Sequence, residues 1–534
     1  MMEDYRVSNS DVIPKRTLAI FMKQMKNCEL VGNGARLWIS GHMHVFTLDR
    51  CENIDISGFK VNWKKPLVAE AVVEDKNENL FKVYIDENKF PHRMKGATLE
   101  FDVGNDEWYP LTRGAIAFEP HSFLTRKGSD DIVIQKIEQI SQSRYLFTLV
   151  GAENVRVGDY LNLRHNARIH AGVFAEKCRE ISFSDLTFYS CGGLGCLAQF
   201  CHNVTFKRVN FLPDRSLGRY VSCGRDDGMH LTCNSGKITV TECLFHALMD
   251  DPINIHGCCV TSDEVVDEYT LKCRYRHNQA CGFHYWAEKG DEIAFIDRRA
   301  MNILSTLNAH SYELVDNESF LLRFESEIPS DVVELAEKGE LLALDNLSHT
   351  AEFECTKNRF GSCRARGILI STPKKVVVSE NIFSSSGSAI LVAGDSNYWF
   401  ESGECHDVLI SKNIFEDGCL TSDYQFCEGV ISICPVVPYP DIDKPYHKNV
   451  RIEDNVFDSN GAPILYALSC KGLVFKSNRI FRSQSLEKWH KQNDAIRLVY
   501  CTDSSLTDNE WIGDLEFDSY VKEENCKNIK TDLK

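Results

Sequence analysis

The chain has 534 residues, of which 43% are apolar and 26% charged, and its formal net charge is −17. This is the composition of an ordinary globular protein, long enough for one extended domain or for two or three compact ones. No Lys/Arg-rich tract offsets the acidic balance, so nucleic acid and anionic membranes are poor partner candidates, whereas a neutral ligand such as a sugar fits. No apolar run approaches the length of a membrane span.

The N-terminus, Met1-Met2-Glu3-Asp4-Tyr5, is acidic and has no apolar core, so we do not expect it to be a signal peptide. Either the protein is cytoplasmic, or a leader and some leading structure are absent from this chain.

A short phrase, apolar-x-apolar-x-x-x-x-Phe, recurs along the chain, often after a Cys and often with an Asn two residues before the aromatic. Its clearest copies begin at Ile54, Ile181, Val204, Ile238, Val376, Val408, Val450 and Leu473. Some copies are 23 residues apart, as Cys178 and Cys201 show, and no helical period intervenes. Short strands at this spacing predict an all-β fold, a right-handed parallel β-helix, with the turn asparagines bonded to one another along the stack. Leucine-rich repeats share the period, but their leucine signature is missing.

The 22 cysteines include no C-x-x-C pair, so zinc-ribbon and thioredoxin-like sites lack their signature. Several occupy the same place in the repeat, namely Cys51, Cys178, Cys201, Cys405 and Cys470. This regularity predicts buried, reduced thiols stacked inside the solenoid rather than a disulfide framework.

Two stretches interrupt the repeat, and both contain a Gly-Asp-x-apolar-x-apolar segment, at Gly158-Asp159 and at Gly290-Asp291. We interpret them as two related, small β-barrel-like insertions. The expected organisation is 1–63, first coils; 64–168, first insertion; 169–261, coils with an acidic patch; 262–350, second insertion; 351–534, C-terminal coils.

One acidic phrase occurs twice in the third segment. Asp226-Asp227 and Asp250-Asp251 are 24 residues apart, and each pair is followed within a few residues by a histidine. If one coil takes about two dozen residues, the pairs stack about 4.8 Å apart on neighbouring coils. Crowded carboxylates raise one another's pKa, which can supply a proton donor and a proton acceptor at one pH. Either pair alone would fit an ordinary solvated turn, but the recurrence favours an active site.

Within this patch we predict that Asp227, Asp250 and Asp251 are catalytic. Substrate-binding roles are predicted for the neighbouring Arg225, Asp226, His230 and His256, although the histidines could instead orient a carboxylate or simply pack. Carboxylates on adjacent coils would span roughly 5–9 Å, which is compatible with both retaining and inverting hydrolysis.

A second cluster lies in a glycine-flanked loop, residues 393–403. Its aromatic residues suit stacking on a sugar ring, and its carboxylates suit binding hydroxyls. Trp399 and Asp395 are therefore predicted to bind substrate, and Glu401 is a further catalytic candidate; the alternative is a packed loop that covers the solenoid. Arg366 could balance the acidic patch or bind hydroxyls, and Glu428 is a weaker binding candidate.

Four segments resemble glycoside hydrolase family 110, the exo-acting α-1,3-galactosidases that remove terminal galactose from blood-group-B-type glycans. They are residues 191–200, 224–230, 247–257 and 394–403. The resemblance implies a β-helix with barrel insertions, an inverting mechanism with no cofactor, and an extracytoplasmic bacterial enzyme. We predict no metal-ligating residues, and a structural metal ion is left open. It places the acid and the base among Asp227, Asp250 and Asp251, with Glu401 as a further candidate.

The expected partner is a galactose-terminated glycan, with no nucleic acid and no membrane insertion, and a homo-oligomer is left open. The high cysteine count departs from what an oxidising compartment favours. A polygalacturonase-like hydrolase is the second enzymatic interpretation, although a polyuronate would call for several Lys or Arg residues where the patch offers mainly Arg225. A non-catalytic glycan-binding β-helix is the third.

Overall fold

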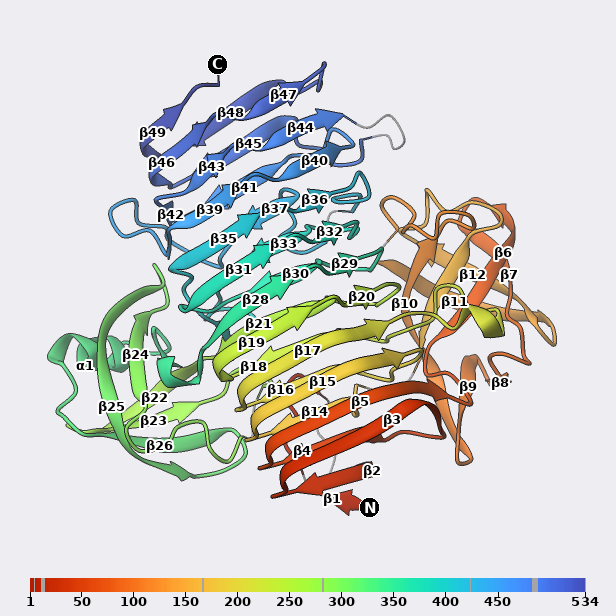
Figure 1. The fold of residues 1–534 in the computed structure, drawn as a ribbon, viewed down its shortest axis with the longest axis horizontal. Helices are drawn as coiled ribbons and strands as arrows, with labels where there is room; N and C mark the ends of the chain where they lie inside the picture. The colour runs from red at the N-terminus through yellow and green to blue at the C-terminus, as the bar shows by residue number, and fades with distance from the viewer. Residues whose placement is uncertain are drawn as a thin grey trace.

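In the computed structural model, described over residues 1–3, 5–10, 15–129, 131–165, 168–280, 283–422, 424–482 and 488–533, stacked coils rise from the N-terminus to the C-terminus (Figure 1). The predicted parallel β-helix is confirmed. One long face is a sheet whose neighbouring strands pair in parallel, apart from the antiparallel β1–β2 pair at its start. Its strands are β1 (Met2–Glu3), β2 (Arg16–Lys23), β4 (His44–Asp49), β14 (Val173–Glu176), β16 (Cys196–Gln199), β18 (Met229–Thr232), β21 (Ile253–Cys258), β30 (Ile368–Ile370), β33 (Ile390–Val392), β37 (Ile431–Ile433), β41 (Leu465–Leu468), β45 (Asp494–Val499) and β48 (Ser519–Glu524).

The remaining faces hold the strands of the recurring phrase, which also stack in parallel. The longer strands are β3 (Lys26–Ile39), β5 (Glu52–Trp63), β15 (Arg179–Phe188), β17 (His202–Phe211), β19 (Ser235–Thr241), β28 (Ala351–Thr356), β31 (Lys375–Ser379), β35 (Asp407–Ser411), β39 (Val450–Glu453), β43 (Val474–Lys476), β46 (Thr502–Thr507) and β49 (Lys527–Thr531). The shorter ones are β20 (Leu244–Phe245), β29 (Arg359–Phe360), β32 (Ile382–Phe383), β36 (Ile414–Phe415), β38 (His447–Lys448), β40 (Val456–Ser459), β42 (Cys470–Lys471), β44 (Arg479–Arg482) and β47 (Glu510–Ile512).

The core contains ladders of like apolar side chains, and in some of them the residue is identical from coil to coil. Phe360, Phe383 and Phe415 stack with ring centroids 4.5 and 5.2 Å apart, because the repeat places the same residue at the same point of each coil. The cysteines of the described residues are free, and all but three of those are buried, as expected for thiols inside the solenoid.

The predicted asparagine ladder is also confirmed. The Oδ1 of Asn413 accepts hydrogen bonds from the backbone N–H and from the side-chain amide of Asn381, both at 3.0 Å. The Nδ2 of Asn413 donates to Asn455 Oδ1 at 3.0 Å and to Val378 O at 2.9 Å. The ladder therefore satisfies the polar groups of the buried turns from one coil to the next.

Replacing Asn413 by Ala should lower the free energy of unfolding by about 2–4 kcal/mol, because several buried donors and acceptors would lose their partner at once. Urea denaturation measures this change. The control is Asn79→Ala in an exposed turn, for which we expect less than about 0.5 kcal/mol. Equal effects of the two substitutions would contradict a structural role for the ladder.

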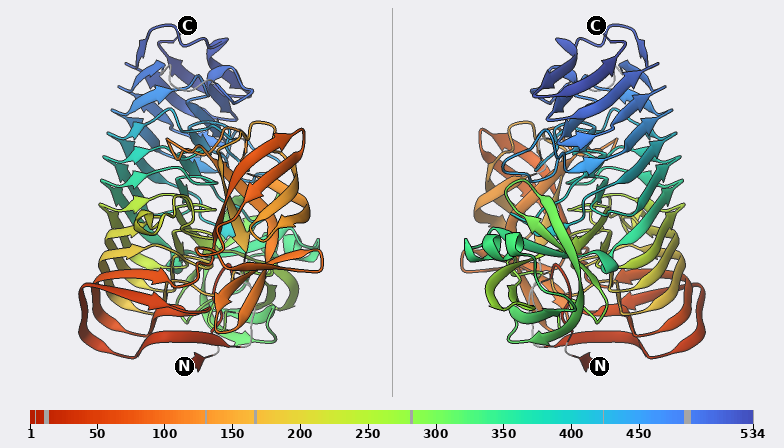
Figure 2. Two further views of the ribbon diagram at one scale, coloured as in Figure 1. Left: turned by 90° about the vertical axis from the view of Figure 1, so that its right-hand side faces the viewer. Right: turned by 90° about the vertical axis from the view of Figure 1, so that its left-hand side faces the viewer.

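Two insertions leave the β-helix on the same long side (Figure 2). The first forms an eight-stranded antiparallel sheet from β6 (Ala69–Asn77), β7 (Leu80–Tyr84), β8 (His92–Lys95), β9 (Thr98–Gly104), β10 (Glu107–Phe118), β11 (Ile132–Ser141), β12 (Arg144–Val150) and β13 (Tyr160–His165). The second is a closed six-stranded barrel of β22 (Val260–Asp267), β23 (Thr270–Arg274), β24 (Glu292–Asp297), β25 (Asn302–Leu314), β26 (Ser319–Phe324) and β27 (Leu342–Asn346), with helix α1 (Ser330–Glu337). Each has a hydrophobic core of its own.

Short elements complete the fold. They are the 3-10 turns η1 (Arg215–Leu217) and η2 (Leu347–His349) and strand β34 (Glu401–Ser402), which pairs with β21 in antiparallel fashion. No helix of the described residues has both the length and the apolar character needed to cross a membrane.

Candidate active site

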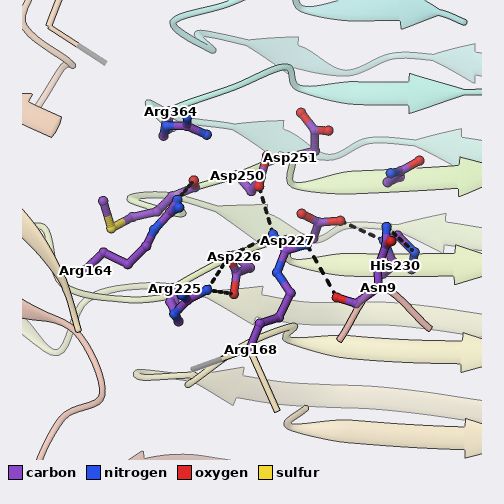
Figure 3. A network of polar contacts seen from close by, with 12 residues as sticks. Asn9, Arg164, Arg168, Arg225, Asp226, Asp227, His230, Asp250, Asp251 and Arg364 are labelled. Atoms are coloured by element: carbon purple, nitrogen blue, oxygen red, sulfur yellow. Dashed lines mark hydrogen bonds and ion pairs between the residues drawn. The ribbon is translucent and has the colours of Figure 1, made fainter. Parts of the chain in front are cut away.

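The two acidic pairs lie on neighbouring coils, as their spacing predicted. Asp226-Asp227 precedes β18 and Asp250-Asp251 precedes β21, and these strands pair in parallel with Met229 opposite Ile253. The Gly228 N–H donates to Asp251 O at 3.0 Å, which fixes one turn against the next. In Figure 3 the carboxylates lie around the side chain of Arg168, which comes from the segment that returns from the first insertion.

Asp226 is a buried counter-ion. Its carboxylate accepts hydrogen bonds from Arg168 Nη2 at 2.8 Å and from Arg225 Nη1 at 2.7 Å. Burial alone would raise the pKa of Asp226, but these guanidiniums, together with Arg164, hold that pKa far below its usual range. Asp226 therefore remains ionised and its charge is matched by arginine.

Asp227 and Asp251 differ from Asp226 because burial dominates their electrostatics. Burial, reinforced by the nearby Asp250, raises the pKa of Asp227 well above its ordinary value. Burial likewise raises the pKa of Asp251 to about 7, although the N–H and Nη2 of Arg366 each donate to its carboxylate at 2.8 Å. Asp250 is more exposed and accepts a 3.1 Å bond from Arg168 Nη2. Asp227 and Asp251 thus face the site with a raised affinity for a proton, whereas Asp226 stays ionised beside them.

The pKa of Asp251 has a consequence for stability. Between about pH 4 and pH 7 the Asp251 carboxyl is protonated in the native state and ionised in the unfolded chain, so its contribution to the free energy of unfolding falls as the pH rises. Above this window that contribution no longer changes with pH. Relative to Asp251→Asn, which cannot ionise, the wild type should lose about 2–4 kcal/mol across the window. Urea denaturation of both proteins at several pH values from 4 to 8 tests this. A stability difference that does not change with pH would contradict it.

Behind Asp227 lie the two histidines of the repeated phrase. His230 Nδ1 is 2.8 Å from Asp227 Oδ2, and His230 Nε2 is 3.0 Å from His256 Nε2. Burial, with the nearby His256 and Arg168, lowers the pKa of His230 well below its usual value, which favours a neutral ring. His256 Nδ1 donates to Gly257 O at 2.5 Å. The predicted alternative that a histidine orients a carboxylate therefore describes the contact between His230 and Asp227.

The carboxylates of Asp227, Asp250 and Asp251 line a pocket with about 680 Å³ of empty space, including its open mouth. Trp399, Tyr424 and Phe426 line the same pocket, together with Leu369, Leu391 and Val436. Aromatic side chains can stack on the apolar face of a sugar ring, and carboxylates can bind its hydroxyls.

The loop 393–403 contributes to this pocket in the way that its residues suggested. Trp399 and Glu401 line it, and Glu401 accepts bonds from Asn9 Nδ2 at 3.0 Å and from Asn254 Nδ2 at 3.2 Å. Asp395 also lines the pocket, but its carboxylate accepts hydrogen bonds from the backbone N–H groups of residues 397, 398 and 399. Asp395 therefore holds the loop in shape.

The other predicted binding residues lie at different depths. Arg366 lines the pocket through its contact with Asp251. The pocket is not lined by Arg225, Asp226, His230 or His256, which lie behind the residues that line it. Glu428 does not line the pocket either, and its backbone N–H donates to Ser432 Oγ. Direct substrate contacts of these five residues remain predictions.

The pocket residues that were not predicted include Asn9, Arg168, Asn254 and Tyr424. Asn254 belongs to the repeated phrase and pairs with His230 on the neighbouring strand. Its position in the repeat could therefore have predicted that it lies at the site. Asn9 and Arg168 carry no such signal, because each reaches the site from a segment that is remote in sequence. Asn9 is held there by the hydrogen bond from its backbone N–H to Gln279 O.

The fold and the pocket together define a β-helical protein with a carboxylate-lined site of the kind found in carbohydrate-active enzymes. Comparison with known proteins identifies its family. Residues 270–335 match the family described as GLAA-B beta-barrel domain II, within the second insertion. The α-1,3-galactosidase B of Bacteroides thetaiotaomicron is 34% identical over 527 residues, covering 96% of this chain and 83% of that protein. The α-1,3-galactosidase A of Bacteroides fragilis is 28% identical over 542 residues, covering 100% and 87%.

The chain therefore belongs to the α-1,3-galactosidase family, glycoside hydrolase family 110, as the four sequence segments indicated. Among solved structures, an exopolygalacturonase of Yersinia enterocolitica covers 94% of this chain and is itself covered over 73% of its length, at 10% identity and a TM-score of 0.33. A likeness this weak carries no argument about function.

Proposed function

We propose that this protein is an exo-acting α-galactosidase that hydrolyses terminal α-1,3-linked galactose with inversion at the anomeric carbon. The observation that carries the proposal is the convergence of Asp227, Asp250 and Asp251 on a single pocket that aromatic side chains also line. Membership of the α-1,3-galactosidase family supports the choice of substrate.

In the proposed reaction, one carboxylic acid donates its proton to the glycosidic oxygen as the bond from that oxygen to the anomeric carbon breaks. A carboxylate on the other side of the ring takes a proton from water as the water oxygen bonds to the anomeric carbon. The products are β-galactose and the shortened glycan. Asp226 is excluded from both roles by its arginine partners, which leaves Asp227, Asp250 and Asp251, with Glu401 as a further candidate that also lines the pocket.

Trp399 and the other aromatic side chains that line the pocket would stack on the apolar face of galactose, while Arg366 keeps Asp251 in place. We further propose blood-group-B-type or linear α-1,3-galactosides as substrates, because the whole chain resembles proteins named for this linkage.

The test is to incubate the protein with galactosyl-α-1,3-galactose and with a fucosylated B-type trisaccharide and to follow the anomeric protons by NMR. We expect β-galactose to appear first, before mutarotation. Early α-galactose would overturn inversion but not hydrolysis. No galactose from either glycan, with oligogalacturonides released from polygalacturonate instead, would overturn the proposal in favour of a uronate hydrolase.

A further inference from the structure

Four side chains converge at the inner end of the pocket, where Asn9 and Glu401 line it and His230 and His256 contact them from behind. His230 comes from β18, His256 from β21, Glu401 from β34, and Asn9 from the N-terminal segment. Their polar atoms form a ring of four contacts, which begins with 3.0 Å between the two Nε2 atoms and 3.3 Å from His230 Nε2 to Asn9 Nδ2. The ring closes with 3.0 Å from Asn9 Nδ2 to Glu401 Oε1 and 3.6 Å from Glu401 Oε1 to His256 Nε2.

Both imidazoles are held through their other nitrogen. Because a carbonyl oxygen only accepts, the contact with Gly257 O places a proton on His256 Nδ1, and His230 Nδ1 is bonded to the Asp227 carboxyl. The His256 Nε2 faces His230 Nε2 at 3.0 Å, so at most one of these two nitrogens carries a proton and the other presents a lone pair to the ring of contacts. Histidines bonded at one nitrogen to a carboxylate and to a carbonyl are the usual arrangement of metal ligands, because the bond fixes the tautomer and the ring orientation.

The distances between these four atoms fit coordination of one shared metal ion. Bonds of about 2.0–2.2 Å to one ion place adjacent ligand atoms roughly 3.0–3.6 Å apart, the range of the four contacts. The nitrogen and oxygen of an asparagine amide exchange places by a half-turn, so Asn9 can present its Oδ1 to the same point.

A second observation also points to a ligand at this end of the pocket. Asn254 is 4% exposed, and its Nδ2 donates to Glu401 Oε2. Its Oδ1 is buried and has no hydrogen-bond partner among the described residues. A buried acceptor without a partner is costly, and a bound cation or a hydroxyl on that cation would satisfy it.

We propose that His230, His256, Glu401 and Asn9 form a binding site for one divalent transition-metal ion at the inner end of the pocket. Two imidazoles with one carboxylate and one amide oxygen suit an ion of intermediate softness, and we take Zn²⁺ as the type, with Mn²⁺ as the harder alternative. The site lies beside the proposed catalytic carboxyls, so its ion could take sugar hydroxyls as further ligands, which is a role that family resemblance did not imply. Metal binding itself does not depend on which glycan is cleaved.

The experiment measures metal rather than activity. The purified full-length protein is stripped with a chelator, titrated separately with Zn²⁺, Mn²⁺ and Co²⁺, and analysed for bound metal after gel filtration. We expect one equivalent per chain of Zn²⁺ or Mn²⁺, and a loss of at least tenfold in affinity in His256→Ala and in Glu401→Ala. Visible absorption of the Co²⁺ form separates this site from adventitious binding to cysteine, because thiolate ligands add charge-transfer bands that nitrogen and oxygen ligands lack.

The matched control is His406→Ala. His406 Nε2 lies 2.8 Å from Glu404, so this pair also joins a histidine to a carboxylate, but among the described residues it belongs to no group of three ligand atoms close enough to share an ion. His406→Ala should retain one equivalent. Wild-type protein that binds neither Zn²⁺ nor Mn²⁺, or binding unchanged in folded His256→Ala and Glu401→Ala, would overturn the site; a protonated His256 beside Glu401 would then account for the contacts.

Discussion

Asparagine in place of Asp227, Asp250 or Asp251 should lower kcat/KM for α-1,3-galactosides by about 10²–10⁴-fold for each residue that transfers a proton. The three carboxyls line one pocket, and Asn keeps the shape of the side chain while it removes the ability to exchange a proton. Circular dichroism and thermal melting should show that the variants remain folded.

The leaving group separates the two roles. With a 2,4-dinitrophenyl α-galactoside the departing oxygen needs no proton, so the variant that lacks the acid should recover much of its activity. The variant that lacks the base should stay slow and should be accelerated by azide, which needs no deprotonation and would yield a β-galactosyl azide. Asp407→Asn, at a half-exposed carboxylate on β35, is the control and should behave like the wild type. Activity within tenfold of the wild type in all three variants would reject the site.

The repeated phrase was sufficient to predict the solenoid because each coil is stabilised by its neighbours through like residues. The register that pairs Val376 with Val408 and then Val450 is the register of the sequence repeats themselves. The ladders of Asn and Phe follow directly from it. In a β-helix the pattern along the chain becomes the contact pattern between coils, so sequence periodicity carries nearly all of the topology.

The acidic patch was predictable for the same reason, but its electrostatics were not. Asp226 and Asp227 are adjacent in sequence, yet arginines bind the first, while burial and a histidine determine the environment of the second. The discriminating partner is Arg168, which comes from outside the repeat. Asn9 is a stronger case, since its contact with Glu401 joins residues 392 positions apart. Contacts of this range leave no local pattern in a single sequence.

Asp226→Asn should be among the most destabilising single changes in this patch, at about 3–5 kcal/mol, because it leaves buried positive charge without its counter-ion. Asp226 is fully buried, and the side chains of Arg168 and Arg225 are only 15% and 12% exposed. Asparagine fits the space but cannot compensate two guanidiniums. Urea denaturation at neutral pH measures the loss. Because Arg168 also bonds Asp250, activity should fall as well, through displacement of a residue in the pocket.

Asp185→Asn provides the matched comparison, since Arg208 makes two hydrogen bonds to the Asp185 carboxylate, at 2.6 and 2.8 Å, on the exposed surface of β15. The chemical change is the same and the paired geometry is similar, but water screens the remaining charge, so the expected cost is below about 1 kcal/mol. A cost for Asp226→Asn no larger than that for Asp185→Asn would mean that the buried arginines find other compensation, and that the acidic patch is not held together by this ion cluster. A large cost that 1 M salt does not reduce would instead show that the cluster is shielded from solvent and supports the catalytic carboxyls from behind.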